Sequence, residues 1–355
     1  MSTATTTKAS IPPRGKPWKA TPTQRLTTFG IFTFSVVISY AAVAVTPLKG
    51  KLAYGAVFFT TFVVIDYLFS RIRQGKSAGA DSIFRGFVTM GISIAVIPIV
   101  SILYTVIARG YKGLHWSLFT KDMHSTPPNA PIGEGGLQHA VIGTLLLVLI
   151  ALIISVPIGM LTAIYTTEIK GRFTRPIKFL VQAMSGVPSI VAGLFILAAI
   201  VYPLTKTFNS FEGSIALAIL MIPTIARTSE EILLLVPQDL RESGVALGGT
   251  QWRTVAQIVL PAARGGLVTA MILGVARVAG ETAPIVLLTG GGDTKNWNIF
   301  HGPMGSLPFY IWKGFGAGTP ESITRAWAGI FVLLILVLTL FIAARLLSNR
   351  KTKKW

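Results

Sequence analysis

The chain contains no cysteine, which excludes disulfides, thiolate metal sites and a thiol nucleophile. Charge is also scarce, because only 13% of the 355 residues are charged, against roughly 25% in soluble domains. Acidic residues are the scarcest, with 13 Asp and Glu against 32 Lys and Arg. A soluble fold must cover its surface with polar groups, so this composition excludes a soluble enzyme.

Apolar runs of membrane-crossing length recur along the chain. Hydrophobic residues make up 52% of it and the mean hydropathy is +0.65, and about 20 apolar residues cross the hydrocarbon core. We predict an all-α polytopic membrane protein with about eight transmembrane helices, at residues 28–46, 53–70, 86–108, 140–166, 177–204, 214–229, 265–289 and 326–347. The sixth is short and contains Pro223, which predicts a helix packed among other helices.

The distribution of basic residues predicts the topology. With the N-terminus inside, 22 Lys and Arg fall in cytosolic segments, nine in outer loops, and Arg277 within a span. By the positive-inside rule, both termini are cytosolic. Residues 1–27 are Thr- and Pro-rich with five Lys and Arg and no acid, which predicts a disordered cytosolic tail. The basic clusters lie between apolar runs, so the net charge of +19 does not indicate nucleic-acid binding.

A predicted cytosolic loop, 229–264, carries the most specific motif. Taken alone, it indicates two short helices broken at Gly248-Gly249, and an amphipathic helix on the membrane surface is one interpretation. Its residues also match, at fixed spacing, the EAA loop of ABC-importer permeases, which they resemble: Glu242, Ser243, Gly244, Gly248, Ile258, Leu260 and Pro261. Ser243 and Gly244 replace the two alanines of that motif and remain small. The resemblance implies a type I ABC-importer permease core in the last six helices, coupled through 242–261 to a separate ATPase.

The chain has no nucleotide site of its own. It lacks the Gly-x-x-x-x-Gly-Lys-Ser/Thr pattern that cradles nucleotide phosphates. We therefore predict a transport subunit without a cofactor, not an enzyme, with ATP and Mg on the partner ATPase. No residue spacing predicts a metal site.

Few ionisable residues fall inside the predicted spans, where each costs about 2.5–3.5 kcal/mol on insertion scales. Arg277 and Glu281 lie four apart in the seventh predicted span, which predicts one helix face for both. Arg227 ends the sixth, and Asp66 lies near the cytosolic boundary of the second. Guanidinium groups offer planar, forked donors to oxyanions. The alternatives are an internal ion pair for Arg277 and Glu281, and a positive-inside anchor for Arg227.

Three strings resemble the PstA family of phosphate-importer permeases: RVAGETAP at 277–284, SGVPSIVAGLF at 185–195 and RTSEE at 227–231. The resemblance covers 84–349, so 28–75 would form two extra N-terminal helices. It implies that Arg227, Arg277, Glu281 and Thr282 act in phosphate translocation. It also implies a PstC-like second permease, two PstB-like ATPases and a PstS-like extracytoplasmic phosphate-binding protein as partners, in the inner or plasma membrane of a prokaryotic cell.

Other transport classes stay open at this stage. The cargo could be another oxyanion, such as sulfate or molybdate. A self-sufficient anion carrier or channel would show inverted repeats or a backbone-lined filter, and neither is found. A purely structural membrane protein has no reason to keep charges in a span. Gly186, Pro188 and Gly193 predict a kinked, closely packed fifth span.

Overall fold

The computed structural model describes residues 22–46 and 50–349, and among these it contains helices and no strand. A single isolated bridge joins Gly290 and Met304. Seven described helices are long and apolar enough to cross a membrane, or up to eight if a bent helix pair counts as one span. The all-α, multi-pass architecture is therefore confirmed. Most of the predicted tail, 1–21, lies outside the described residues, and its last residues, 22–27, are helical.

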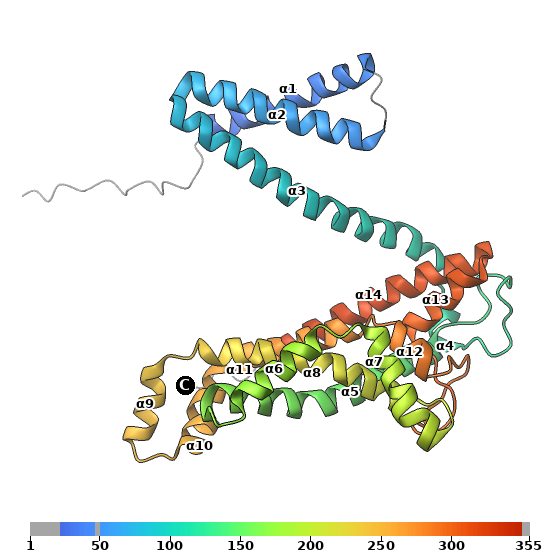
Figure 1. The fold of residues 1–355 in the computed structure, drawn as a ribbon. Helices are drawn as coiled ribbons and strands as arrows, with labels where there is room; N and C mark the ends of the chain where they lie inside the picture. Colours follow the sequence, from blue (N-terminus) through green and yellow to red (C-terminus); the bar gives the residue numbers. More distant parts are fainter. Residues whose placement is uncertain (1–21, 47–49, 350–355) are drawn as a thin grey trace, which may run out of the picture. The chain divides into compact units, whose positions relative to one another are not determined.

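Figure 1 labels the helices along the chain. They are α1 (Pro22–Val45), α2 (Lys51–Gln74), α3 (Lys76–Gly110), η1 (Tyr111–Gly113), α4 (Ser117–Thr120), α5 (Gln138–Ile164), η2 (Tyr165–Ile169), α6 (Thr174–Ser185), α7 (Ser189–Ile196), η3 (Leu197–Thr205), α8 (Ser210–Leu234), α9 (Gln238–Ala246), α10 (Gln251–Thr254), η4 (Val255–Val259), α11 (Leu260–Val278), α12 (Ala283–Leu288), α13 (Leu307–Ala317) and α14 (Pro320–Asn349). The segments η2, η3 and η4 are π-helical.

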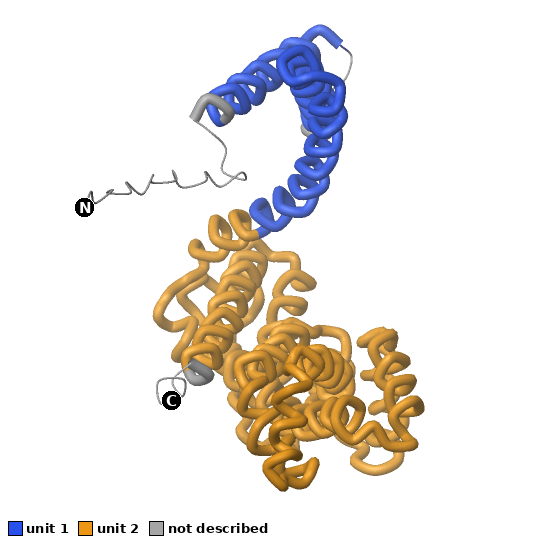
Figure 2. Tube along the Cα trace, turned by 90° about the vertical axis from the view of Figure 1, so that its left-hand side faces the viewer, with its two compact units in different colours: residues 1–102 blue, residues 103–355 orange. Residues whose placement is uncertain are grey.

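Two compact units divide the chain within α3, at Ile102 (Figure 2). In the first unit, α1 and α2 form a hairpin in which the hydroxyls of Ser39 and Thr61 lie 2.9 Å apart. Asp66 of α2 is buried, and Arg85 of α3 donates to its carboxylate at 2.9 Å. The pair neutralises a carboxylate that the sequence had left without a partner.

Helix α8 is the central helix of the second unit. Within its apolar window 61% of residues are buried, against 6% to 33% in the other candidate spans. Its Leu217 and Met221 pack with Leu147 of α5 and Val278 of α11 in one core cluster. The predicted burial of the sixth span is confirmed, although the helix is longer than 214–229 and continues through Pro223.

The kink predicted in the fifth span is present, and it is sharp enough to divide the span into two helices. Helix α6 and the following helix, Ser189–Thr205, meet at 104°. Gly186 ends α6, and Pro188 precedes α7 in an extended conformation, because proline has no N–H to continue the ladder. The predicted close packing is present: a Cβ on Gly193 would lie 2.9 Å from the Cα of Pro284.

The seventh predicted span, 265–289, also requires correction. One continuous helix runs from Gln251 through η4 to Val278, so it starts in the cytosolic loop and ends earlier than predicted. The chain then breaks before α12, because Pro284 favours a helix start and Gly280 tolerates a turn.

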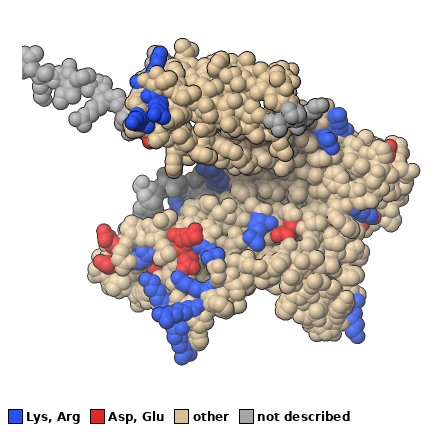
Figure 3. Space-filling model, turned by 45° about the horizontal axis from the view of Figure 1, so that its top comes forward, with Lys and Arg blue, Asp and Glu red and all other residues tan. Residues whose placement is uncertain are grey.

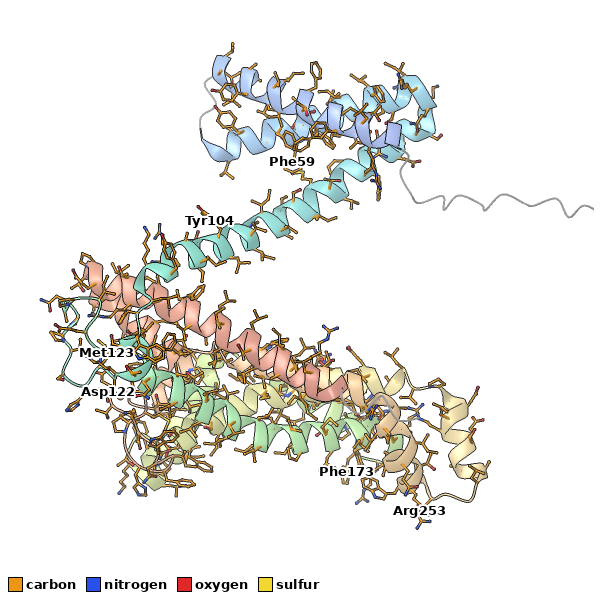
Figure 4. The ribbon with its side chains drawn as sticks, turned by 180° about the vertical axis from the view of Figure 1, so that it is seen from behind. Phe59, Tyr104, Asp122, Met123, Phe173 and Arg253 are labelled. Atoms are coloured by element: carbon orange, nitrogen blue, oxygen red, sulfur yellow. The ribbon has the colours of Figure 1, made fainter. Side chains whose placement is uncertain are left out.

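The second unit is elongated between two ends. Figure 4 shows Phe173 and Arg253 at one end and Asp122 and Met123 at the other. We call the end that carries η2, α9 and α10 the coupling end, and the end that carries α4 and α13 the loop end. At the loop end, the buried Arg325 donates to the backbone carbonyls of Ala130 and Pro131, both at 2.7 Å. The predicted cytosolic loop, 229–264, therefore lies with Phe173 at the coupling end, away from Asp122 and Met123.

Candidate functional site: the coupling hairpin and the intramembrane arginines

The EAA-like motif folds as a helical hairpin at the coupling end. Helix α9 carries Glu242, Ser243 and Gly244, and the chain turns at Gly248, whose φ is +82°. Only glycine adopts this left-handed conformation at little cost, so the turn explains the glycine of the motif. The predicted break at Gly248-Gly249 is confirmed, but only the first of the two helices is short, because the second continues from Gln251 to Val278.

The two arms of this hairpin touch at Gly244. A Cβ there would lie 2.6 Å from Cγ2 of Thr254 and 2.8 Å from Cδ1 of Ile258, so the position admits only a very small residue. This contact explains why the motif requires small residues at one end and isoleucine at the other. Leu260 opens α11 and packs against the adjoining core cluster, and Pro261 follows directly after the π-helical segment η4 within the continuous helix.

A buried ion pair fixes the hairpin to the rest of the unit. Arg241 of α9 donates to both carboxylate oxygens of Glu168 in η2, at 2.7 Å from Nη2 and 2.9 Å from Nε. The Glu168 side chain is 4% exposed and that of Arg241 is 18% exposed. The same guanidinium donates to the carbonyls of Leu233 and Val236, at the C-terminal end of α8. One side chain therefore ties α9 to both α5, through η2, and α8.

The charge state of Arg241 follows from these contacts. Its hydrogen bonds to Glu168 raise the pKa of the guanidinium above its ordinary value, against the opposing effect of burial. Carbonyls at a helix C-terminus also favour a nearby cation. Arg241 is thus a permanent positive charge at the junction of three elements.

Beside this ion pair lies a hollow of about 940 Å³. Glu242 and Gln238 of α9 line one wall, and Glu168 and Lys170 line another. Figure 3 shows charged side chains gathered over the coupling end, with wide uncharged surface elsewhere on the same face. An open, charged hollow next to an exposed helix can receive a protruding part of another protein.

Arg227 lies on the side of α8 that faces away from α11. It follows Ile225 by two residues, about 200° around the helix, and Ile225 faces Gly274 of α11. Arg227 is exposed and lines a cavity of about 380 Å³ with Lys178 of α6 and Glu230 of α8. Lys178 and Glu230 form an ion pair. Glu230 is therefore engaged by Lys178, and Arg227 takes part in none of the ion pairs among the described residues.

Arg277 and Glu281 do not share a helix face, which corrects the predicted stacking. Helix α11 ends at Val278, so Arg277 lies in its last turn and Glu281 in the break that follows. Arg277 is exposed, Glu281 is half-buried, and among the described contacts no ion pair joins them. Thr282 precedes α12, and its hydroxyl lies 3.5 Å from the carbonyl of Gly280.

The two arginines lie at different depths. Gly266 of α11 faces Ile232 of α8, and Gly274 faces Met221, so these helices run antiparallel. Arg277 lies beyond Gly274 toward the loop end, whereas Arg227 lies between the two contacts, nearer the coupling end. The structure therefore places the two predicted translocation arginines one after the other along the length of the unit. It does not bring them into one site.

No sequence pattern indicated the two ion pairs of this region, Glu168–Arg241 and Lys178–Glu230. Arg241 directly precedes the motif residue Glu242, and this position was the available signal. No group of three or more metal-ligating side chains occurs in the described part of the chain.

A family model described as a binding-protein-dependent transport system inner membrane component matches residues 155–353. The chain belongs to this permease family. Phosphate transport system permease protein PstA 1 of Mycobacterium tuberculosis (strain CDC 1551 / Oshkosh) is 37% identical over 82% of this chain and 94% of its own length. PstA of Mycobacterium leprae is 39% identical over 73% of this chain and 86% of its own. PstA of Pasteurella multocida is 36% identical over 71% of this chain and 88% of its own length.

Among solved structures, an inward-facing MetNI methionine ABC transporter aligns with a TM-score of 0.49 and 20% identity. The alignment covers 61% of this chain and 95% of that one.

Proposed function

We propose that this chain is the transmembrane permease subunit of an ATP-driven phosphate importer. The observation that carries the proposal is 37% identity to a phosphate permease over 82% of the chain. The coupling hairpin supports it, because a subunit without a nucleotide site needs a mechanical contact with an ATPase.

The proposed complex has four kinds of partner. A second, PstC-like permease completes the pathway, and two PstB-like ATPases, which bind ATP and Mg, dock at the coupling end. A PstS-like phosphate-binding protein docks at the loop end, outside the cell. This arrangement places both termini in the cytosol, as the distribution of basic residues predicts.

Coupling follows from the contacts of α9. When an ATPase displaces α9, Arg241 pulls on Glu168 and on the C-terminal carbonyls of α8. Helix α8 is the central helix of the unit and carries Arg227, so its movement changes the exposure of that guanidinium. Arg277 and Arg227 then offer successive, weakly held positions for phosphate, since conduction requires binding that is not too tight.

The cargo is tested by deleting the gene and measuring uptake of radiolabelled phosphate at low micromolar concentration. We expect uptake to be lost, to return with the parent gene, and to be blocked by excess arsenate and not by sulfate. If phosphate uptake survives and sulfate or molybdate uptake falls, the chain serves another oxyanion.

Glu281 is proposed to select phosphate over sulfate. Its carboxylate can accept a hydrogen bond from the protonated oxygen of phosphate, whereas sulfate has no proton to donate at neutral pH and is repelled. Glu281→Gln should therefore lower phosphate uptake and raise sulfate uptake relative to the parent, measured with both labelled anions in the same cells. Unchanged uptake of both anions would refute this role.

A further inference from the structure

The cavity beside Arg227 has a composition that the transport scheme does not yet use. It lies between α5, α6 and α8, and its volume is about 380 Å³. One water occupies about 30 Å³ of liquid, so the space admits a small oxyanion with part of its hydration shell. Leu234 lines both this cavity and the hollow beside α9, so the two are neighbours.

The donors in this cavity come from two helices. Arg227 and Gln182 both line the cavity, and among the described contacts neither side chain has an ion-pair or hydrogen-bond partner. Lys178 lies four residues before Gln182 on α6, so both point from the same face. The hydroxyls of Thr162 and Thr166, by contrast, donate to carbonyls of their own helix. The cavity therefore presents two cations and one amide to an anion.

The acceptors determine how strongly an anion is held. Glu230 engages Lys178, and Glu231 lines the same cavity. Two carboxylates balance two cations, so an entering anion must compete with Glu230 for Lys178. Such a site binds briefly and releases, as a permeation pathway requires.

We propose that this cavity is a binding station for an inorganic oxyanion at the coupling end, with Arg227 and Lys178 as its cations and Glu230 as the carboxylate that competes for Lys178. The inference rests on the proposed function. It adds Lys178 as a second cation and Glu230 as the carboxylate whose competition promotes release of the anion. The cavity borders the hollow beside α9, so a movement of the coupling hairpin would change the lining that the two share.

The test uses the complete importer in proteoliposomes, with the ATPases and ATP inside and the binding protein and labelled phosphate outside. Unlabelled phosphate is loaded inside at increasing concentration, where it can occupy the station and inhibit uptake. Lys178→Gln removes a cation and should raise the inhibitory concentration about fivefold, the effect of one partly exposed charged contact. Glu230→Gln releases Lys178 and should lower that concentration by a similar factor. Arg175→Gln, an exposed arginine on the same helix outside the cavity, should match the parent.

The decisive result is that Lys178→Gln and Glu230→Gln shift the inhibitory phosphate concentration in opposite directions. If the ion pair were purely structural, losing either partner would shift that concentration in the same direction. The proposal would be refuted if both variants shifted the inhibitory phosphate concentration in the same direction, or if their values equalled that of Arg175→Gln. If Lys178→Gln does not assemble, Glu230→Gln decides alone. Sulfate loaded inside tests whether the station accepts oxyanions in general or phosphate only. A parent complex that takes up no phosphate would refute the proposed function instead.

Discussion

At the scale of single residues, Arg241 joins separate elements at the coupling end. It satisfies the buried Glu168 and two carbonyls at the end of α8, so it joins three elements through one side chain. Removing this side chain would leave the Glu168 carboxylate buried without its donor.

We expect Arg241→Ala to destabilise the protein by about 3–5 kcal/mol, because it leaves Glu168 as an unpaired buried charge. Thermal unfolding of the purified protein in detergent measures this. The double variant with Glu168→Gln should recover part of the loss, since the uncompensated charge is then gone. Arg253→Ala is the control, because Arg253 is exposed and makes no ion pair among the described contacts. Equal stability of Arg241→Ala and Arg253→Ala would contradict the assignment.

Tyr310 offers a residue-scale test at the loop end. Burial raises the pKa of its phenol to about 12, and its hydroxyl has no partner among the described contacts. The folded state thus holds the proton more strongly than the unfolded state, whose pKa is about 10. The contribution of this pKa difference to the free energy of unfolding is fully present below pH 10. It is lost as the pH rises from 10 to 12.

Tyr310→Phe should remove this alkaline loss and change stability at neutral pH by less than about 1 kcal/mol, since no hydrogen bond is broken. Unfolding temperature measured between pH 8 and 12 gives the answer, with Tyr111→Phe, an exposed tyrosine, as the control. A marked loss at neutral pH would mean that the hydroxyl has a bonding role.

At the scale of elements, the coupling hairpin depends on one turn and one contact. Gly248 sets the turn with its positive φ, and Gly244 allows the arms to meet. The hairpin is small and has little core of its own, so its geometry is maintained by these two glycines and by Arg241.

Gly248→Ala should cost about 1–2 kcal/mol, the penalty for an L-residue in the left-handed region, and reduce uptake more than it reduces the amount of assembled complex. Gly265→Ala, at a helical position with open space around the new methyl group, should be neutral or slightly stabilising. Uptake per assembled complex separates coupling from folding. Equal uptake by the two variants would show that the turn is dispensable.

At the scale of the whole molecule, the second unit separates two surfaces. The coupling hairpin occupies one end, and Arg325 holds the loops at the other. The translocation candidates Arg277 and Arg227 lie between these ends at successive depths. This order suits a subunit that receives cargo at one end and is moved from the other.

The orientation is testable by labelling, because the chain has no native cysteine to interfere. We expect Arg172→Cys at the coupling end to react with an impermeant maleimide only in inside-out vesicles. Lys295→Cys, in the segment between α12 and α13, should react only in right-side-out cells. Both residues are exposed. The reverse pattern would invert the topology.

The sequence by itself determined the membrane class, most of the helices and the coupling motif. Apolar length and the spacing of Glu242, Gly248 and Pro261 are local properties of the chain, so a linear pattern records them. Helix continuity at 251–278 and the break at Glu281 were missed, because apolar runs do not reveal where a helix ends inside the membrane. Only the tertiary structure decided which charges meet. Glu168 and Arg241 are 73 residues apart in sequence. Only the packing of the helices brings such residues together, and no periodic pattern in the sequence connects them.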